Sequence, residues 1–182
     1  MTVAGTPAAA APEFSRPVRL DTLGEGPRAM PIAATPDERL ALARRFGLAA
    51  LEMLEADATL RRDGARVFVE GRLRAGVVQH CVATGDPVPA AIDAAFSLRF
   101  DPEVPAAGEE EIELSEADLD VVHYAGGAID LGEAVAETLA LELDPFPRCA
   151  DADERLRAAG VLSEGEAGPF AALAALKDKL GK

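Results

Sequence analysis

The sequence predicts an α+β fold, in which an antiparallel β-sheet or a partly closed barrel is packed by helices. Three segments, at residues 54–61, 67–74 and 88–100, alternate apolar and polar side chains with the period of two that is typical of half-buried strands. Two segments with clear helix N-caps lie outside this block of strands. Strands and helices are therefore largely separate along the chain, which favours α+β over alternating α/β.

Ahead of these strands, the chain predicts a short edge strand and a loop. Phe14–Leu20 alternates in hydrophobicity, and Pro17 within it cannot donate a hydrogen bond to a neighbouring strand, so an edge position is expected. Gly24–Pro31 predicts a loop because it contains two glycines and two prolines.

The first helix is expected over residues 36–46. Thr35 is a suitable N-cap, Pro36 suits the first helical position, and Glu38 completes a capping box. The buried face of this helix is expected to contain Leu40, Ala43 and Phe46.

The three alternating segments predict a hairpin followed by a long third strand. Asp63 and Gly64 form a typical hairpin turn, so residues 67–74 should return beside residues 54–61. After a turn at residues 84–87, apolar residues occupy every second position from Val88 to Phe100, which predicts one face toward the core. Shorter strands are expected at residues 112–114 and 119–124.

Residues 131–143 predict the helix that packs on the apolar face of this sheet. Asp130 is the expected N-cap and Glu133 its capping-box partner. Apolar residues then recur at a spacing of four, and prolines at positions 145 and 147 end the helix. An amphipathic C-terminal helix is expected over residues 169–180.

This pattern divides the chain into four parts. We expect a disordered leader at residues 1–12, a single α+β domain at 13–150, a linker at 151–168 and the C-terminal helix within 169–182. No apolar run approaches the ~20 residues of a membrane span, and the first residues lack the features of a signal peptide. Two cysteines make no disulfide framework, although the sequence leaves a single bridge between them open. A cytoplasmic protein without a membrane partner is therefore expected.

The net charge of −14 is concentrated in the second half of the chain. Residues 76–154 contain 19 acidic and two basic side chains, a net charge of −17. The negative potential of this region attracts cationic partners and disfavours binding to phosphate backbones through charge alone. The alternative is that the acidic residues serve only to keep the protein soluble. The residues expected to contact a protein partner are Glu109, Glu110, Glu111, Glu133, Glu137, Phe170, Leu173 and Leu176. The residues expected to contact RNA, if RNA is bound, are Arg61, Arg62, Arg66, Arg72 and Arg74.

The soft metal ligands of the chain are His80, Cys81, His123 and Cys149. Four such residues could close a tetrahedral zinc site, but their spacings are wide and no Cys-x-x-Cys occurs. A nucleophilic pair of His123 with either cysteine is another alternative. We expect a buried Cys81, a half-exposed Cys149 and no catalytic residue or cofactor. Cys81, His123 and Cys149 stay as candidate metal ligands.

Three blocks of the sequence together resemble the YceD family, the large ribosomal RNA accumulation proteins of bacteria and plastids. The blocks are Val78–Val88 (VQHCVATGDPV), Ile129–Pro147 (IDLGEAVAETLALELDPFP) and Gly168–Leu180 (GPFAALAALKDKL). They are similar to the family's strand–Cys–turn segment, its helix ending in a proline pair and its terminal Pro-Phe-Ala segment. Their order and spacing extend the resemblance over about residues 13–182.

The resemblance implies a non-enzymatic factor for accumulation of large-subunit ribosomal RNA, with no known cofactor. Many relatives carry Cys-x-x-Cys in the first block and further cysteines after the proline pair, which looks like a metal site. Here Thr84 stands in place of the second cysteine, so at most a vestigial zinc site is expected. The resemblance also implies that Cys81 and Cys149 approach each other in space.

The resemblance implies a ribosome assembly factor, and the acidic charge indicates that it binds a basic ribosomal protein or a large-subunit precursor through an acidic surface. Two alternatives stay open. One is a Cys/His metal-binding protein or thiol-dependent small-molecule enzyme. The other is a generic acidic adaptor whose terminal helix docks in a groove of its partner.

Overall fold

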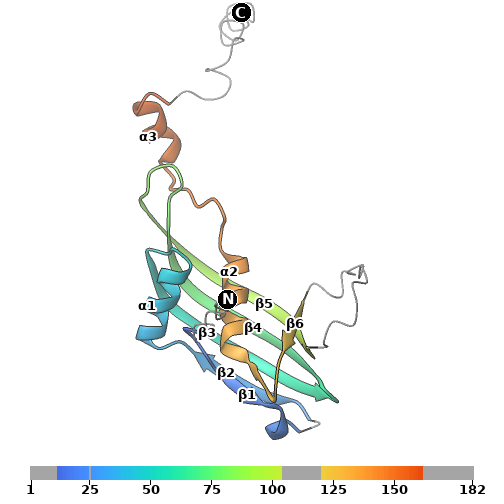
Figure 1. Ribbon diagram of the computed structural model, residues 1–182. Helices are drawn as coiled ribbons and strands as arrows, with labels where there is room; N and C mark the ends of the chain where they lie inside the picture. Colours follow the sequence, from blue (N-terminus) through green and yellow to red (C-terminus); the bar gives the residue numbers. More distant parts are fainter. Residues whose placement is uncertain (1–11, 25, 104–119, 162–182) are drawn as a thin grey trace, which may run out of the picture. The chain divides into compact units, whose positions relative to one another are not determined.

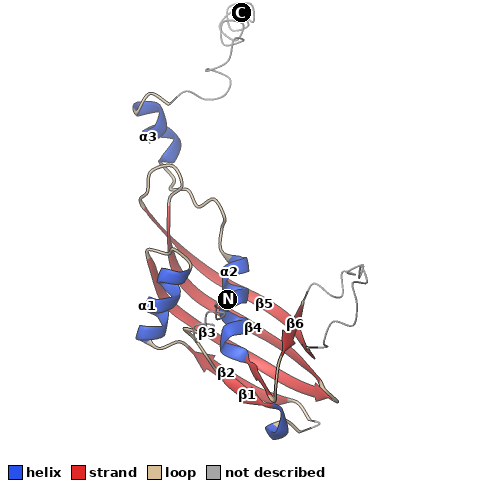
Figure 2. Ribbon diagram, in the orientation of Figure 1, coloured by secondary structure: helices blue, strands red, loops and turns tan. Residues whose placement is uncertain are grey.

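Strands and helices are segregated in the computed structural model, which describes residues 12–24, 26–103 and 120–161 (Figure 2). The elements are β1 (Pro17–Arg19), η1 (Leu20–Thr22), β2 (Arg28–Ala33), α1 (Pro36–Arg45), β3 (Ala50–Asp63), β4 (Arg66–His80), β5 (Pro87–Pro102), β6 (Val121–Tyr124), β7 (Ala128–Asp130), α2 (Leu131–Glu142) and α3 (Ala152–Ala158). The predicted α+β class is confirmed. None of the described helices is long and apolar enough to cross a membrane.

The chain forms two compact units. The larger lies within Met1–Val78 and Pro89–Asp144, and the smaller within Gln79–Val88 and Pro145–Lys182. Our division into a leader, a domain over residues 13–150, a linker and a terminal helix stays a prediction. The expected strand at residues 112–114 and the expected helix at 169–180 lie outside the described residues.

A five-stranded sheet with the order β2-β3-β4-β5-β6 dominates the larger unit (Figure 1). β2 and β4 both pair antiparallel with β3, whereas β6 runs parallel to β5, so the sheet is mixed at that edge. β2 and β6 form two separate edges, and the predicted open sheet is therefore present rather than the barrel. A second, two-stranded sheet pairs β1 antiparallel with β7.

The hairpin between β3 and β4 forms where the sequence predicts it. Asp63 lies opposite Arg66, which leaves a two-residue loop of Gly64 and Ala65. Gly64 has a φ of 61°, and this left-handed conformation at the first loop position is the one that a II′ turn requires. The apolar residues of the first alternating segment are all buried, as expected for a half-buried strand: Leu54, Ala56, Ala58 and Leu60.

The expected loop at Gly24–Pro31 is wrong in its second half, because Arg28–Ala33 forms β2. This strand pairs along its whole length with β3, from Arg28 opposite Leu60 to Ala33 opposite Glu55. Pro31 is accommodated because β2 is an edge strand, where a missing N–H leaves no ladder bond unmade.

The hydrophobic core lies between the sheet and the helices α1 and α2, which cover the same face (Figure 1). α1 has the predicted capping box, with Glu38 N–H donating to Thr35 Oγ1 and Thr35 N–H to the Glu38 carboxylate. Ala43 is buried as predicted, but Leu40 is 53% exposed and Leu42 is buried in its place. Phe46 is partly buried against the core.

α2 begins at the predicted cap and buries the predicted face. Asp130 accepts hydrogen bonds from the backbone N–H groups of Gly132 and Glu133. Val135 and Leu139 are completely buried, and Leu143 packs against the core just beyond the helix. The predicted stripe on β5 is buried only in its second half, at Phe96 and Phe100, while Ala90 is exposed.

Candidate functional site

The smaller unit brings the two cysteines together. Cys81 lies in the connection between β4 and β5, and Cys149 follows the proline-containing segment after α2. Their Sγ atoms are 3.2 Å apart, and the Cys149 N–H donates to Cys81 Sγ over 3.3 Å. The approach that the family resemblance implied is confirmed, and both thiols are free.

Local turns place both cysteines. The connection between β4 and β5 turns at Gly85, whose φ of 78° suits glycine, and the Gly85 N–H donates to the Cys81 carbonyl. The Val82 N–H donates to the carbonyl of Pro147 over 2.9 Å, which ties the two segments together next to the sulfurs. Cys81 is buried and Cys149 is half-buried, as expected.

Hydrogen bonds change the acidity of the two thiols in opposite directions. The Thr84 hydroxyl and the Cys149 N–H stabilise the Cys81 thiolate and lower the pKa of Cys81 to about 6. Thr84 also acts to lower the pKa of Cys149, with Oγ1 at 3.4 Å from Sγ, but the neighbouring Cys81 sulfur and burial outweigh it and raise that pKa. The pair therefore loses one proton well before the other.

The charged residues around the cysteines are paired with one another. Arg155 of α3 binds the carboxylates of Asp86 and Asp151, and Arg148 binds Asp153 over 2.6 Å. A hydrogen bond from Cys149 and then the nearby Arg155 lower the pKa of Asp151. Arg155 therefore holds the β4–β5 connection to α3, and its positive charge offsets part of the charge of two acidic side chains.

The predicted metal ligands do not assemble into one group in the described residues. There, no three His, Cys, Asp or Glu side chains lie where they could hold a metal ion together. His80 is exposed and its Nδ1 lies 3.4 Å from the Gly85 carbonyl oxygen. His123 belongs to the other unit, where it lies on β6 opposite Asp101. Metal binding at Cys81, His123 or Cys149 stays untested.

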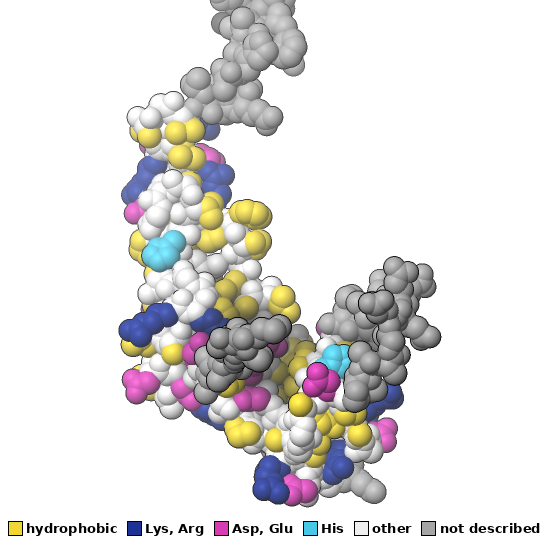
Figure 3. Space-filling view, in the orientation of Figure 1, with side chains coloured by type: hydrophobic (Ala, Val, Ile, Leu, Met, Phe, Trp, Pro, Cys, Tyr) yellow, Lys and Arg dark blue, Asp and Glu magenta, His cyan; other side chains and the backbone are white. Residues whose placement is uncertain are grey.

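The arginines of the first hairpin are largely engaged within the larger unit. Arg72 binds Asp93 over 2.5 Å, and Arg74 binds Glu55 and Asp57 over 3.0 and 2.6 Å. On the face drawn in Figure 3, basic and acidic side chains are interspersed as well.

The other three hairpin arginines have different partners. The Arg61 guanidinium lies over the Phe68 ring, 4.6 Å from its centre. Arg62 donates to the carbonyls of Gly64 and Leu20, and Arg66 lies 3.5 Å from Asp101. RNA contact through any of the five arginines stays a prediction.

The residues predicted to contact a protein partner fall into three groups. Glu109, Glu110, Glu111, Phe170, Leu173 and Leu176 lie outside the described residues. Glu133 is not a capping-box partner of Asp130, because its carboxylate binds Arg45 of α1 over 2.7 and 3.0 Å. Glu137 is exposed on the outer face of α2.

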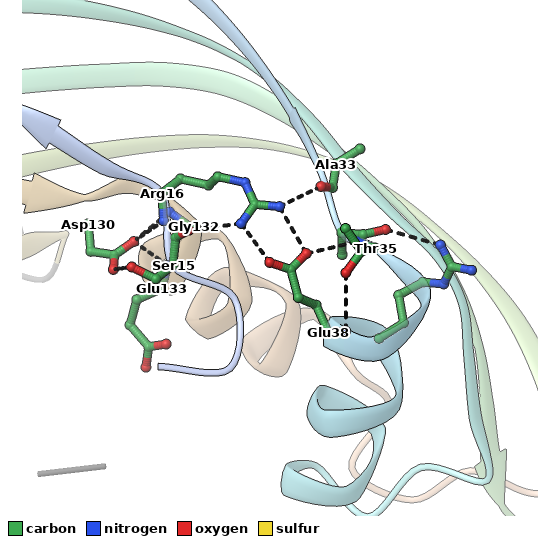
Figure 4. A network of polar contacts seen from close by, with 10 residues as sticks. Ser15, Arg16, Ala33, Thr35, Glu38, Asp130, Gly132 and Glu133 are labelled. Carbon is green, nitrogen blue, oxygen red and sulfur yellow. Dashed lines mark hydrogen bonds and ion pairs between the residues drawn. The ribbon is translucent and has the colours of Figure 1, made fainter. Parts of the chain in front are cut away.

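A polar network that the sequence did not predict joins the N-termini of α1 and α2 (Figure 4). Asp130 accepts hydrogen bonds from Ser15 Oγ and from the Arg16 N–H. The Arg16 side chain extends to the Glu38 carboxylate, at 2.7 and 2.9 Å, and to the Ala33 carbonyl. Arg16 thereby lowers the pKa of Glu38 to about 2. The sequence predicts only the two helix caps, because Arg16 is distant in sequence from both Glu38 and Asp130.

Comparison with known proteins identifies one family. The model of the family described as "Large ribosomal RNA subunit accumulation protein YceD" matches residues 69–177. The matched segment contains most of β4, all of β5 and α2, and both cysteines. Neither the curated proteins nor the solved structures yield a significant match. Because the family match covers more than half of the chain, this chain belongs to the YceD family of large ribosomal RNA subunit accumulation proteins.

Proposed function

We propose that this chain is a non-enzymatic factor that supports large-subunit ribosomal RNA accumulation by binding a basic ribosomal protein or a precursor particle. The family membership is the observation that carries the ribosomal part of this proposal. The excess of acidic residues over residues 76–154 supports a cationic partner, since opposite charge accelerates encounter and selects partners.

The C-terminal half of α2 is the best candidate for the contact surface among the described residues. Glu137 and Glu142 are exposed and make no ion pair with any described residue. Leu141 lies beside them and is 86% exposed. An exposed leucine between carboxylates suits a partner that offers basic side chains around an apolar contact.

The helix dipole strengthens this interpretation. The C-terminal end of a helix carries partial negative charge, which basic side chains normally compensate. The last turn of α2 contains no basic residue, and Glu142 adds a carboxylate there. This arrangement destabilises the helix and makes the potential at its C-terminal end more negative. A cationic partner bound there would compensate the negative charge.

Charge reversal on α2 tests this proposal. A tagged double variant, Glu137→Lys with Glu142→Lys, should lose the large-subunit precursors and ribosomal proteins that the wild-type chain retains after sedimentation of a lysate. The control double variant, Glu52→Lys with Glu70→Lys, changes the net charge equally at exposed positions on the sheet. The proposal fails if wild-type protein stays at the top of the gradient and its depletion leaves large-subunit RNA unchanged. Equal losses in both double variants would refute the assignment to α2.

The same ribosomal function could also involve direct RNA contact through the hairpin arginines, but the structure supports this less than contact with a basic protein. Arg72 and Arg74 face carboxylates at ion-pair distance, which reduces the positive potential that a phosphate backbone would meet. Nuclease treatment of the captured material distinguishes the two forms, because retention through RNA is lost and retention through protein is kept.

A further inference from the structure

We propose that Cys81 and Cys149 form a reversible intramolecular disulfide, so that the smaller unit contains a redox-sensitive modification site. The two Sγ atoms are 3.2 Å apart, and a disulfide requires about 2.05 Å, so an approach of about 1 Å completes the bond. This inference is independent of the proposed ribosomal function.

Backbone hydrogen bonds hold both cysteines in position before any bond forms. The Cys81 N–H donates to the Asp86 carbonyl over 2.7 Å, and the Ala152 N–H donates to the Cys149 carbonyl over 3.1 Å. The Val82–Pro147 hydrogen bond joins the two segments one residue beyond Cys81. The sulfurs therefore meet in the folded, reduced chain without rearrangement of its turns.

The donor set also fits a dithiol better than a tetrahedral metal site. A structural zinc site needs four ligands, and in the described ranges no third His, Cys, Asp or Glu joins the two sulfurs in a metal-binding group. Thr84 contributes a hydroxyl that hydrogen-bonds with Cys149. Adjacent thiols that are kept reduced and oxidise reversibly are typical of redox-sensing proteins.

A peroxide is the oxidant that completes the chemistry. Cys149 donates a hydrogen bond to Cys81, so Cys81 carries the thiolate of the pair. This thiolate attacks one peroxide oxygen, the O–O bond breaks, and Cys81 becomes a sulfenic acid as hydroxide leaves. Cys149 sulfur then attacks Cys81 sulfur, the S–O bond breaks and a second hydroxide leaves. The two thiol protons convert both hydroxides to water, so the sulfurs lose two electrons and the peroxide gains two.

Hydrogen peroxide treatment of the full reduced chain tests the proposal. After oxidation and blocking of free thiols, the intact mass should be lower by two hydrogen atoms and no thiol should be blocked. Trypsin should release residues 75–99 covalently joined to residues 149–155, and dithiothreitol should separate them. The reaction should be at least about tenfold faster than in the urea-unfolded chain, because sulfurs held in contact react as an intramolecular pair.

Several results would overturn the inference. They are further oxidation of Cys81 to a sulfinic acid with Cys149 still free, disulfides that join two chains, and a rate no faster than in urea. Cys149→Ser and Cys81→Ser are the matched variants, and each should abolish the linked peptides. The decisive measurement uses the wild-type chain, so the inference stays testable even if a serine variant does not fold.

Discussion

Gly132 is the residue at which one added methyl group would meet fixed backbone atoms. A Cβ there would lie 2.3 Å from the Phe14 carbonyl oxygen and 2.8 Å from the Arg16 nitrogen. Ala in place of Gly within a helix ordinarily stabilises by roughly 0.5–1 kcal/mol. Here the backbone must separate, so Gly132→Ala should lower the free energy of unfolding by about 3 kcal/mol, at the upper end of overpacking costs. Urea unfolding measures this change.

Gly127→Ala is the matched control for this prediction. A Cβ at position 127 would have no atom within 4 Å, so the free energy of unfolding should stay within about 0.5 kcal/mol of wild type. Similar effects of both substitutions would show that the segment at residues 14–16 does not press on α2.

Arg16 should make the stability of the chain depend on pH through Glu38. The pKa of Glu38 is lowered to about 2 from 4.5, so its contribution is fully present above pH 4.5 and is lost as the pH falls through about 2. Arg16→Met should therefore cost about 2 kcal/mol at neutral pH, within the range for hydrogen bonds to charged groups. The difference from wild type should shrink as the pH falls, in urea unfolding series at successive pH values.

Arg19→Met controls for the loss of one arginine in the same segment. Arg19 pairs with Asp21, and these side chains are 72% and 61% exposed, so solvent screens the pair and Arg19→Met should leave stability nearly unchanged at every pH. A difference between wild type and Arg16→Met that persisted unchanged at low pH would contradict the role of the Glu38 carboxylate.

The two faces of α2 should respond differently to the same substitution. Leu139 is completely buried, so Leu139→Ala should lower the free energy of unfolding by about 2–5 kcal/mol. Leu141 is 86% exposed, so Leu141→Ala should change stability by less than about 0.5 kcal/mol. If the outer face contacts a partner, Leu141→Ala should nevertheless reduce capture of ribosomal material in a pull-down. Unchanged capture would remove Leu141 from the contact surface.

Helices and strands were predicted correctly where short-range interactions along the chain determine them. The period of two predicted β3 and β4, and the caps at Thr35 and Asp130 predicted where α1 and α2 begin, because both signals act within a few residues. β2 was not predicted, because it is a strand only through its pairing with β3. Its own sequence contains a proline and no alternating pattern that would indicate a strand.

Contacts between residues far apart in sequence could not be predicted from local patterns either, because they depend on tertiary packing. Glu133 has the spacing of a capping-box partner, but Arg45, 88 residues away in sequence, binds it instead. The burial of Leu42 in place of Leu40 depends on which side of α1 meets β3, a matter of tertiary packing. The cysteines are 68 residues apart, so only the family resemblance, and not their spacing, predicted their approach.

Among the described residues of the molecule, some carboxylates form ion pairs with arginines, and others do not. Asp93 pairs with Arg72, and Glu133 shares Arg45 with Glu13, so arginines of the N-terminal half reduce the contribution of these carboxylates to the long-range field. Exposed carboxylates without an ion pair in the described chain, such as Glu137 and Glu142, contribute more. The net charge of −14 therefore acts on a partner mainly through such exposed groups.

Binding to a cationic partner should consequently weaken as salt is added. Exposed charges are screened beyond about 10 Å at 0.1 M ionic strength, which reduces both attraction and the rate of encounter. Titration of the wild-type chain onto purified large-subunit precursor particles at increasing salt should show a steady loss of affinity. The Glu137→Lys, Glu142→Lys variant should bind more weakly at low salt and lose less affinity as salt rises. Affinity that is independent of salt would instead indicate that apolar groups such as Leu141 dominate the contact.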